Sequence, residues 1–273
     1  MGLDHLLLLA AIQGITEFIP VSSSGHLQLV QGLTAYPDHG LVIDVALHTG
    51  TLLAVMAYFR RDVRLMLNGT RDIIRRQPST AAHLVQVLAI ASLPVLLAGA
   101  ALVVFDVTYV LRMPEIVAWA SIIFAIPLWL ADRRQGLASP NITSERGDPQ
   151  SISPRHALII GLAQMLALIP GASRAGVTIT AGLFLGFDRT QAARFSMLLA
   201  MPVIAAFALI GLVDLVQSGA PQALGTALVA ALLAGLFAFA TIHVFLKMTR
   251  MMGLLPFVIY RIGLGIGLLV VLA

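Results

Sequence analysis

Long apolar windows are the feature that most constrains what this chain can fold into. Four of them stay apolar for about the 17–25 residues that a helix needs to cross a bilayer. They cover residues 84–105, 114–131, 195–213 and 223–246. Hydrophobic residues make up 59% of the 273-residue chain and charged residues only 11%, against about 45–50% and 25% in soluble domains. We therefore predict an all-α integral membrane protein.

The first apolar run is similar to a secretory signal peptide but lacks its basic flank. Only Asp4 and His5 precede the apolar residues, and Gln13, Glu17 and Pro20 interrupt the run after Ile12. We expect this run to belong to the mature membrane domain. The chain has no cysteine, which excludes a disulfide framework and the Cys-dependent phosphatase and protease mechanisms.

Two short segments 150 residues apart resemble each other, since Ile-Pro-x-x-Ser occurs at residues 19–23 and again at 169–173. Proline cannot continue a helix, and small polar residues favour caps and turns. Short apolar stretches flank both segments, at 3–19 and 27–36 in the first case and at 156–169 and 177–187 in the second. We predict a re-entrant helix–loop–helix hairpin at each segment.

Three apolar spans follow each predicted hairpin, at 41–59, 84–105 and 114–131 and then at 192–213, 223–246 and 254–272. Because three crossings end on the opposite side from their start, the second copy must be inverted relative to the first. The prediction is a single membrane domain over residues 1–273 with two inverted-topology repeats, six full spans and two re-entrant hairpins. Repeat one covers 1–131, a cytoplasmic linker covers 132–154 and repeat two covers 155–273.

The basic residues give an independent test of this topology. The loops on one predicted side hold Arg60, Arg61, Arg64, Arg71, Arg75, Arg76, Arg133, Arg134, Arg146, Arg155, Arg189, Lys247 and Arg250, and those on the other side hold only Arg112. By the positive-inside rule the crowded side is cytoplasmic, so both termini lie outside. The net charge of +4 therefore reports topology, and we expect no nucleic-acid partner.

Polar residues gather at the two predicted hairpin tips. The first tip holds Glu17, Ser22, Ser23, Ser24 and His26, and the second holds Ser173, Arg174 and Thr178. Inverted hairpins would bring both tips near the membrane midplane, where each ionisable group costs about 2.5–3.5 kcal/mol on insertion scales. Such groups are usually retained for function or as a mutual pair.

Glu17 shares a helix face with Gln13, four residues earlier. Its carboxylate could act as a base, or could hold a divalent cation such as Mg²⁺ or Ca²⁺ with Gln13 as a supporting ligand, because hard cations prefer oxygen ligands. The alternative interpretation is an inward polar stripe in which Glu17 forms a salt bridge with Arg174.

Arg174 opens a half-helix after a Pro-Gly break. Its guanidinium and the free backbone N–H groups of the helix start favour a phosphate, and Thr178, one turn later, could add a hydroxyl. The structural alternative is that Arg174 only pairs with Glu17.

The serine run at the first tip also has two interpretations. Any one of Ser22, Ser23 and Ser24 could simply cap the second half-helix. His26 stands at i+3 from Ser23 and at i+4 from Ser22, and could take a proton from a serine nucleophile.

Five other polar residues in or near the spans are weaker candidates. We expect helix-pairing or interfacial roles for Asp44, His48, Arg194, His243 and Arg261. Three glycines follow Arg261 at positions 263, 265 and 267, which suggests close packing against another helix or against a second subunit in a homodimer.

At this point the chain resembles the bacterial undecaprenyl diphosphate phosphatases, also called bacitracin-resistance proteins. Residues 13–26, Gln-Gly-Ile-Thr-Glu-Phe-Ile-Pro-Val-Ser-Ser-Ser-Gly-His, are similar to the family's Glu/Gln-x-x-x-Glu motif with its serines and histidine. Residues 170–178 are similar to its Pro-Gly-x-Ser-Arg-Ser-x-x-Thr motif. Ala175 departs from this pattern, since it stands where the motif has a second serine.

The resemblance covers the whole chain and implies hydrolysis of undecaprenyl diphosphate in the bacterial plasma membrane, with the lipid carrier recycled for cell-wall synthesis. It also implies the inverted-repeat fold and a site that opens to the periplasmic face. The missing hydroxyl at Ala175 could weaken phosphate binding but spares the proposed nucleophile and Arg174.

Our mechanistic hypothesis is that Ser23 attacks the terminal phosphorus with His26 or Glu17 as base. Arg174, Ser173 and Thr178, with Ser22 and Ser24 on the other tip, would hold the phosphate oxygens. A variant of this mechanism uses activated water and leaves Ser23 as a ligand. From a different class, a membrane transporter or lipid flippase would share the inverted-repeat anion site.

Overall fold

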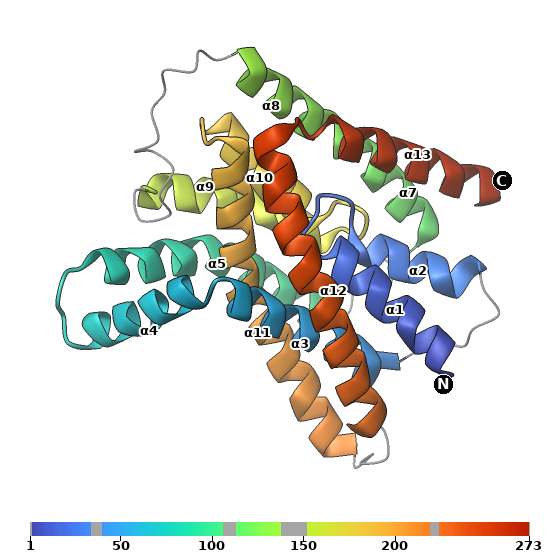
Figure 1. The fold of residues 1–273 in the computed structure, drawn as a ribbon, viewed down its shortest axis with the longest axis horizontal. Coiled ribbons are helices and arrows are strands. Elements are labelled where there is room, and N and C mark those ends of the chain that lie inside the picture. The colour runs from blue at the N-terminus through green and yellow to red at the C-terminus, as the bar shows by residue number, and fades with distance from the viewer. Residues whose placement is uncertain (1, 34–39, 106–112, 138–151, 219–223, 273) are drawn as a thin grey trace.

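The computed structural model describes residues 2–33, 40–105, 113–137, 152–218 and 224–272. Every regular element among them is helical (Figure 1). The elements are α1 (Leu3–Thr16), α2 (Ser23–Leu33), α3 (Gly40–Tyr58), α4 (Arg60–Ile74), α5 (Thr80–Val104), α7 (Pro114–Ile123), α8 (Ala125–Leu137), α9 (Pro154–Met165), the 3-10 turn η3 (Leu166–Leu168), α10 (Arg174–Phe184), α11 (Arg189–Ser218), α12 (Leu224–Met251) and α13 (Leu255–Leu272). The predicted all-α class is confirmed.

Within the described residues, five helices are long and apolar enough to cross a membrane. They are Gly40–Tyr58, Thr80–Val104, Pro114–Gln135, Arg189–Gly211 and Leu224–Met251. Large apolar side chains point outward along them, such as Leu97, which is 62% exposed, and Leu236, which is 69% exposed. Lipid is the solvent that suits such a surface. The chain is therefore a multi-pass membrane protein.

Three shorter apolar helices fall below that length, namely Leu3–Thr16, Pro154–Leu168 and Leu255–Val271. The first two are the segments predicted to enter the membrane without crossing it. The third is the predicted sixth span at 254–272, so six full crossings stay a prediction.

Helix α4 lies where the sequence analysis placed only a basic loop. Its apolar residues Val63, Leu65 and Met66 pack against the core, and it runs beside the start of α5 (Figure 1). The two helices approach so closely that a Cβ added at Gly69 would lie 2.1 Å from the Ala81 carbonyl oxygen. The predicted span at 84–105 consequently begins earlier, at Thr80.

The span predicted at 114–131 is broken and longer than expected. Pro127 cannot donate a hydrogen bond to the carbonyl of the preceding turn, and the helix divides at Phe124 into α7 and α8. Because α8 continues to Leu137, the predicted linker at 132–154 is helical in its first residues. Asp132 in this part of α8 accepts hydrogen bonds from Arg189 Nε at 2.5 Å and Leu254 N at 2.9 Å.

Helices of the first half pack directly on helices of the second half. Helix α3 packs on α12, α5 on α9, and α13 on α7. Small residues allow this approach, since a Cβ at Gly50 would lie 2.0 Å from the Ala231 carbonyl oxygen. Figure 1 shows the start of α1 and the end of α13 on the same side of the molecule, away from α4.

Candidate active site

Two turns at the centre of the molecule carry the predicted site residues, one between α1 and α2 and the other between η3 and α10. Ser22 ends the first turn with a φ of 76° and Ser173 ends the second with a φ of 67°. A non-glycine residue in this region is strained by about 1–3 kcal/mol, and such strain collects at functional sites. The two turns therefore share an uncommon backbone conformation.

Each of these serines caps the helix that follows it. The Gly25 N–H donates to Ser22 Oγ at 3.3 Å, and the Gly176 N–H donates to Ser173 Oγ at 3.1 Å. The serine carbonyls accept from His26 N and Val177 N, four residues further on. This capping satisfies backbone donors that the helix start leaves free.

The capping geometry shifts the sequence alignment by one residue. Ile-Pro-x-x-Ser aligns Ser23 with Ser173, but the helix starts align Ser22 with Ser173 and Ser23 with Arg174. The second turn has one more residue between its proline and its capping serine. Gly171 accommodates it with a φ of 93°, where a Cβ would lie 2.4 Å from the Val117 carbonyl oxygen.

Glu17 is the point at which the two turns meet. Its carboxylate accepts hydrogen bonds from Ser23 Oγ at 2.7 Å and Gln13 Nε2 at 3.0 Å, and from Arg174 Nη2 at 3.3 Å. The side chains of Glu17 and Arg174 are only 8% and 11% exposed. The structure thus brings Gln13, Glu17, Ser23 and Arg174 together, as the sequence predicted.

The remaining contacts of Arg174 fix its guanidinium beside Glu17. Nη1 donates to the Ser196 carbonyl at 2.9 Å, and the guanidinium carbon lies 5.9 Å from the centre of the Phe18 ring. Ser196, in α11, was not singled out in the sequence. A small residue inside an apolar span gives no local signal for this role.

His26 lies beside the cluster but does not contact Ser23. Its Nδ1 is 2.6 Å from the Ser22 carbonyl oxygen and its Nε2 is 2.6 Å from the Tyr260 hydroxyl. Because a carbonyl only accepts, Nδ1 donates, and a neutral ring then accepts the Tyr260 proton at Nε2. The two rings also stack, with centroids 5.6 Å apart. In this arrangement the carboxylate of Glu17, not His26, contacts the Ser23 hydroxyl.

The other predicted phosphate ligands are placed differently from one another. Ser24 is exposed and lies 3.3 Å from Ser22 Oγ, whereas Ser22 and Ser173 are buried caps. Ser22 also accepts from the Gly171 N–H at 3.2 Å, which joins the two turns. Thr178 Oγ1 donates to the Arg174 carbonyl at 2.8 Å and lies 2.7 Å from Ser196 Oγ. Their roles as phosphate ligands stay predictions.

Ala175, where the family motif has a serine, is 1% exposed and packs in the hydrophobic core. Its side chain therefore faces apolar residues.

His48, for which the sequence predicts a helix-pairing or interfacial role, lies next to the cluster. His48 Nε2 is 3.9 Å from Glu17 Oε2. On its other side, Nδ1 lies 2.8 Å from the carbonyl oxygen and 3.3 Å from a carboxylate oxygen of Asp44. The i, i+4 pairing of Asp44 and His48 in an apolar span was the signal that could have found this residue.

Arg261, which lies in α13, donates hydrogen bonds to the second turn. Its side chain is fully buried, and Nη2 donates to the carbonyls of Gly171 and Ala172, each at 2.9 Å. Nε donates to the Ser121 carbonyl at 3.2 Å. Of the glycines that follow, Gly265 packs against Ala118 of α7, while an added Cβ at Gly263 or Gly267 would meet no atom of the described residues within 4 Å. Arg261 is thus a structural link among α13, α7 and the turn.

No group of three or more His, Cys, Asp or Glu side chains suited to a metal ion occurs in the described parts of the chain. The buried Gln13 Oε1, however, has no hydrogen-bond partner there. This free oxygen lies on a side chain that already contacts Glu17.

Over nearly its whole length the chain is similar to known proteins. The chain is similar to the proteins named undecaprenyl-diphosphatase of Maricaulis maris, with 44% identity over 99% of both chains, and of Magnetococcus marinus, with 45% identity over 97% of both chains. It is also 42% identical to the undecaprenyl-diphosphatase of Hahella chejuensis over 97% of both chains. The model of the family described as bacitracin resistance protein BacA matches residues 6–267. Because this match spans nearly the whole chain, the protein belongs to the bacitracin resistance protein BacA family.

Proposed function

We propose that this protein hydrolyses undecaprenyl diphosphate to undecaprenyl phosphate and inorganic phosphate, as the names of its relatives suggest. This reaction recycles the lipid carrier for cell-wall synthesis and confers bacitracin resistance. One observation carries the proposal, namely the Ser23 hydroxyl held 2.7 Å from a buried carboxylate that also pairs with Arg174. A nucleophile, a base and an anion ligand stand in one place.

In the proposed mechanism, Glu17 takes the proton from Ser23 Oγ as Oγ bonds to the terminal phosphorus. The bond from that phosphorus to the bridging oxygen breaks, and undecaprenyl phosphate leaves. Glu17 passes its first proton to the leaving undecaprenyl phosphate, accepts a proton from the water that attacks the phosphoserine, and returns that proton to Ser23 Oγ as the bond to phosphorus breaks and inorganic phosphate leaves. Arg174 stabilises the negative charge on the non-bridging oxygens, which is the main demand of phosphoryl transfer.

The rival mechanism uses activated water directly, with Ser23 as a ligand. Rapid acid quench during turnover separates the two, since only the first mechanism accumulates a phosphoserine at position 23. A phosphorylated peptide containing Ser23 supports the nucleophile. Its absence, under a quench that traps a control phosphoenzyme, supports activated water.

We further propose a divalent cation, Mg²⁺ or Ca²⁺, held by Glu17 and the free Oε1 of Gln13. When bound, it would neutralise diphosphate charge. With so few protein ligands, the substrate's own oxygens would complete its coordination, as is usual for Mg²⁺. Removal of divalent ions by a chelator should lower turnover, and restoration should discriminate Mg²⁺ from Ca²⁺. Unchanged turnover after chelation would contradict the cation.

We also propose the inverted-repeat arrangement, with both termini and the site opening on the periplasmic side. The matching serine caps of the two turns and the distribution of arginines support it. Cysteines at Asn68 and Gly225 test it, because both positions are exposed and the chain has no native cysteine. An impermeant thiol reagent outside intact cells should label Gly225→Cys alone. Labelling of Asn68→Cys would contradict the topology.

A transporter or flippase remains the alternative from another class. Such a protein needs an anion site but has no need of a hydroxyl bonded to a carboxylate, so the Ser23–Glu17 contact favours the enzyme. Purified protein in detergent should release phosphate from a polyprenyl diphosphate, and Ser23→Ala should not. Absence of release from well-folded protein would contradict the proposed function.

A homodimer through α13, with Gly263 and Gly267 open on its surface, is a further proposal that cross-linking can test.

A further inference from the structure

The excess positive charge of the chain is concentrated in one short segment outside the candidate site. Residues 60–76 hold six arginines and two aspartates, so their balance of +4 equals the net charge of the whole chain. The rest of the sequence holds as many acidic as basic residues. This segment is α4 with the turn that follows it.

Both aspartates of the segment are engaged in other contacts. Asp62 accepts a hydrogen bond from Arg194 Nη2 at 2.7 Å, and Asp72 accepts one from Ser79 Oγ at 2.6 Å. The six arginines, in contrast, are all exposed. The outer surface of α4 is therefore cationic.

Four of these arginines form one stripe. At 3.6 residues per turn, Arg60, Arg64 and Arg71 of α4 and its C-cap residue Arg75 fall within a narrow sector, and we call this set the arginine stripe. Gly69, which is buried against α5, lies on the opposite face. Leu67 and Ile74 border the stripe and are 66% and 77% exposed. The exposed face thus carries cationic side chains with large apolar side chains along one edge.

We propose that the arginine stripe is a docking surface for the anionic head groups of phospholipids in the leaflet at which α3 ends. Only Phe59 separates α3 from α4, so the stripe starts where a membrane span finishes. Juxtamembrane basic segments attract anionic lipid, and apolar residues on such a face enter the interface. A nucleic acid would match the charge but not the exposed Leu67 and Ile74, and the position of the stripe directly after a membrane span favours lipid over an acidic protein.

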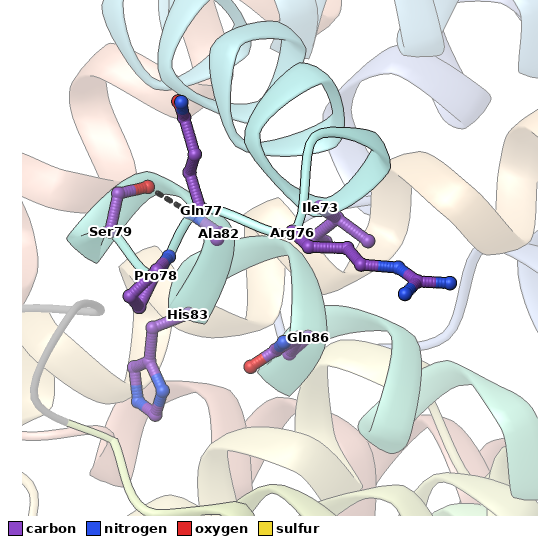
Figure 2. A pocket seen from close by; sticks show the side chains of 8 residues that line it. All are labelled: Ile73, Arg76, Gln77, Pro78, Ser79, Ala82, His83 and Gln86. Carbon is purple, nitrogen blue, oxygen red and sulfur yellow. Dashed lines mark hydrogen bonds between the residues drawn. The ribbon is translucent and has the colours of Figure 1, made fainter.

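A nearby pocket is separate from the arginine stripe. It has a volume of about 400 Å³ and lies at the turn between α4 and α5, lined by Arg76, Gln77, His83 and Gln86 among others. Figure 2 shows these side chains spreading in different directions instead of converging. The stripe, which faces outward along α4, is the docking surface.

Native mass spectrometry of the full chain can test this proposal. The protein is released from bilayers of mixed phosphatidylglycerol and phosphatidylcholine, and the retained lipids are counted. We expect phosphatidylglycerol to be enriched about fivefold or more over its bulk fraction, because each basic residue at such a surface adds measurably to binding. Replacing the four stripe arginines by Gln should abolish most of this enrichment.

A matched control replaces four other basic residues by Gln. They lie on the same predicted side of the membrane and are Arg133, Arg134, Lys247 and Arg250. This control should keep the enrichment. Equal loss in both variants would show an effect of bulk charge and overturn the proposal, as would equal retention of the two lipids by the unaltered protein. Binding of a labelled RNA or acidic peptide at the stripe, without lipid enrichment, would overturn it in favour of another partner.

A second measurement covers the case in which the stripe variant does not fold. A fluorophore on Leu67→Cys, a single cysteine in this chain, should be quenched by phospholipids that carry a nitroxide in the head group. Quenching should increase with the phosphatidylglycerol fraction. No quenching would contradict membrane docking independently of the arginine variants.

Discussion

The turn before α2 and the turn before α10 share a capping serine with positive φ, yet the next residue differs, Ser23 in the first and Arg174 in the second. Both of these side chains reach the carboxylate of Glu17. The same local scaffold therefore presents a hydroxyl from one half and a guanidinium from the other. Their supports differ too, since Gln13 contacts the shared carboxylate while Arg261 holds the second turn.

This difference teaches that the two halves divide the chemistry between them. If the comparison is correct, changes at the two helix starts should abolish activity, and changes at the two capping serines should mainly affect stability. Substitutions at these residues test the division, and we expect the largest effect at Ser23.

Ser23→Ala should reduce phosphate release by about four orders of magnitude or more, because a nucleophile cannot be replaced by its neighbours. The melting temperature should change little, since the lost hydroxyl donates one hydrogen bond to Glu17. Turnover and thermal unfolding of the purified protein check both parts. Activity close to that of the unaltered protein would remove Ser23 from the nucleophile role.

Arg174→Lys should lower turnover by about 10²–10³-fold, because Lys keeps the charge but loses the planar fork that grips two phosphate oxygens. The Glu17–Arg174 ion pair is present in the structure, so the experiment must also distinguish phosphate binding by Arg174 from a purely structural role in this pair. A structural pair predicts that Lys largely replaces Arg.

The controls for this second prediction are Arg174→Ala and Glu17→Gln. Breaking a buried pair by removing one partner costs about 3–5 kcal/mol, so both variants should be less stable. If Arg174→Lys retains near-native turnover while only these two variants unfold early, the phosphate clamp is wrong.

Arg261→Gln should destabilise the protein by about 1–3 kcal/mol, because the carbonyls of Gly171 and Ala172 lose a charged donor in a buried site. The second turn should loosen and turnover should fall through misplacement of Arg174. Tyr260→Phe is the neighbouring control on α13, since it removes only the hydroxyl that contacts His26. An equal effect of the two changes would mean that Arg261 has no specific role in the turn.

Ser22→Ala and Ser173→Ala should each cost about 0.5–2 kcal/mol of stability, the usual value of a helix cap. Each turn loses the acceptor for one backbone N–H, at Gly25 or at Gly176. Residual turnover should exceed that of Ser23→Ala by a wide margin. A complete loss of turnover in well-folded Ser22→Ala would show that the first cap also binds substrate, which breaks the comparison.

Hydropathy and local breakers were sufficient to predict much of the fold. The membrane spans follow from long apolar runs, and the two turns follow from proline and serine, because both signals act over a few neighbouring residues. The cluster of Gln13, Glu17, Ser23 and Arg174 was predicted from the same segments and their resemblance to a family. Helix α4 was missed, since its arginines were interpreted only as markers of topology.

The partners within the site were decided by the tertiary structure. Helical spacing suggested that His26 faces Ser23, but Ser22 lies before α2 with positive φ, and His26 instead bonds to its carbonyl and to Tyr260 of α13. The contacts of His48 with Glu17 and of Arg261 with Gly171 likewise join residues distant in sequence. The sequence alone determined which segments are apolar enough to span a membrane, where the two turns fall and which residues carry charge. Which side chains meet depends on φ at single turn residues and on packing between distant helices, and no local pattern encodes either.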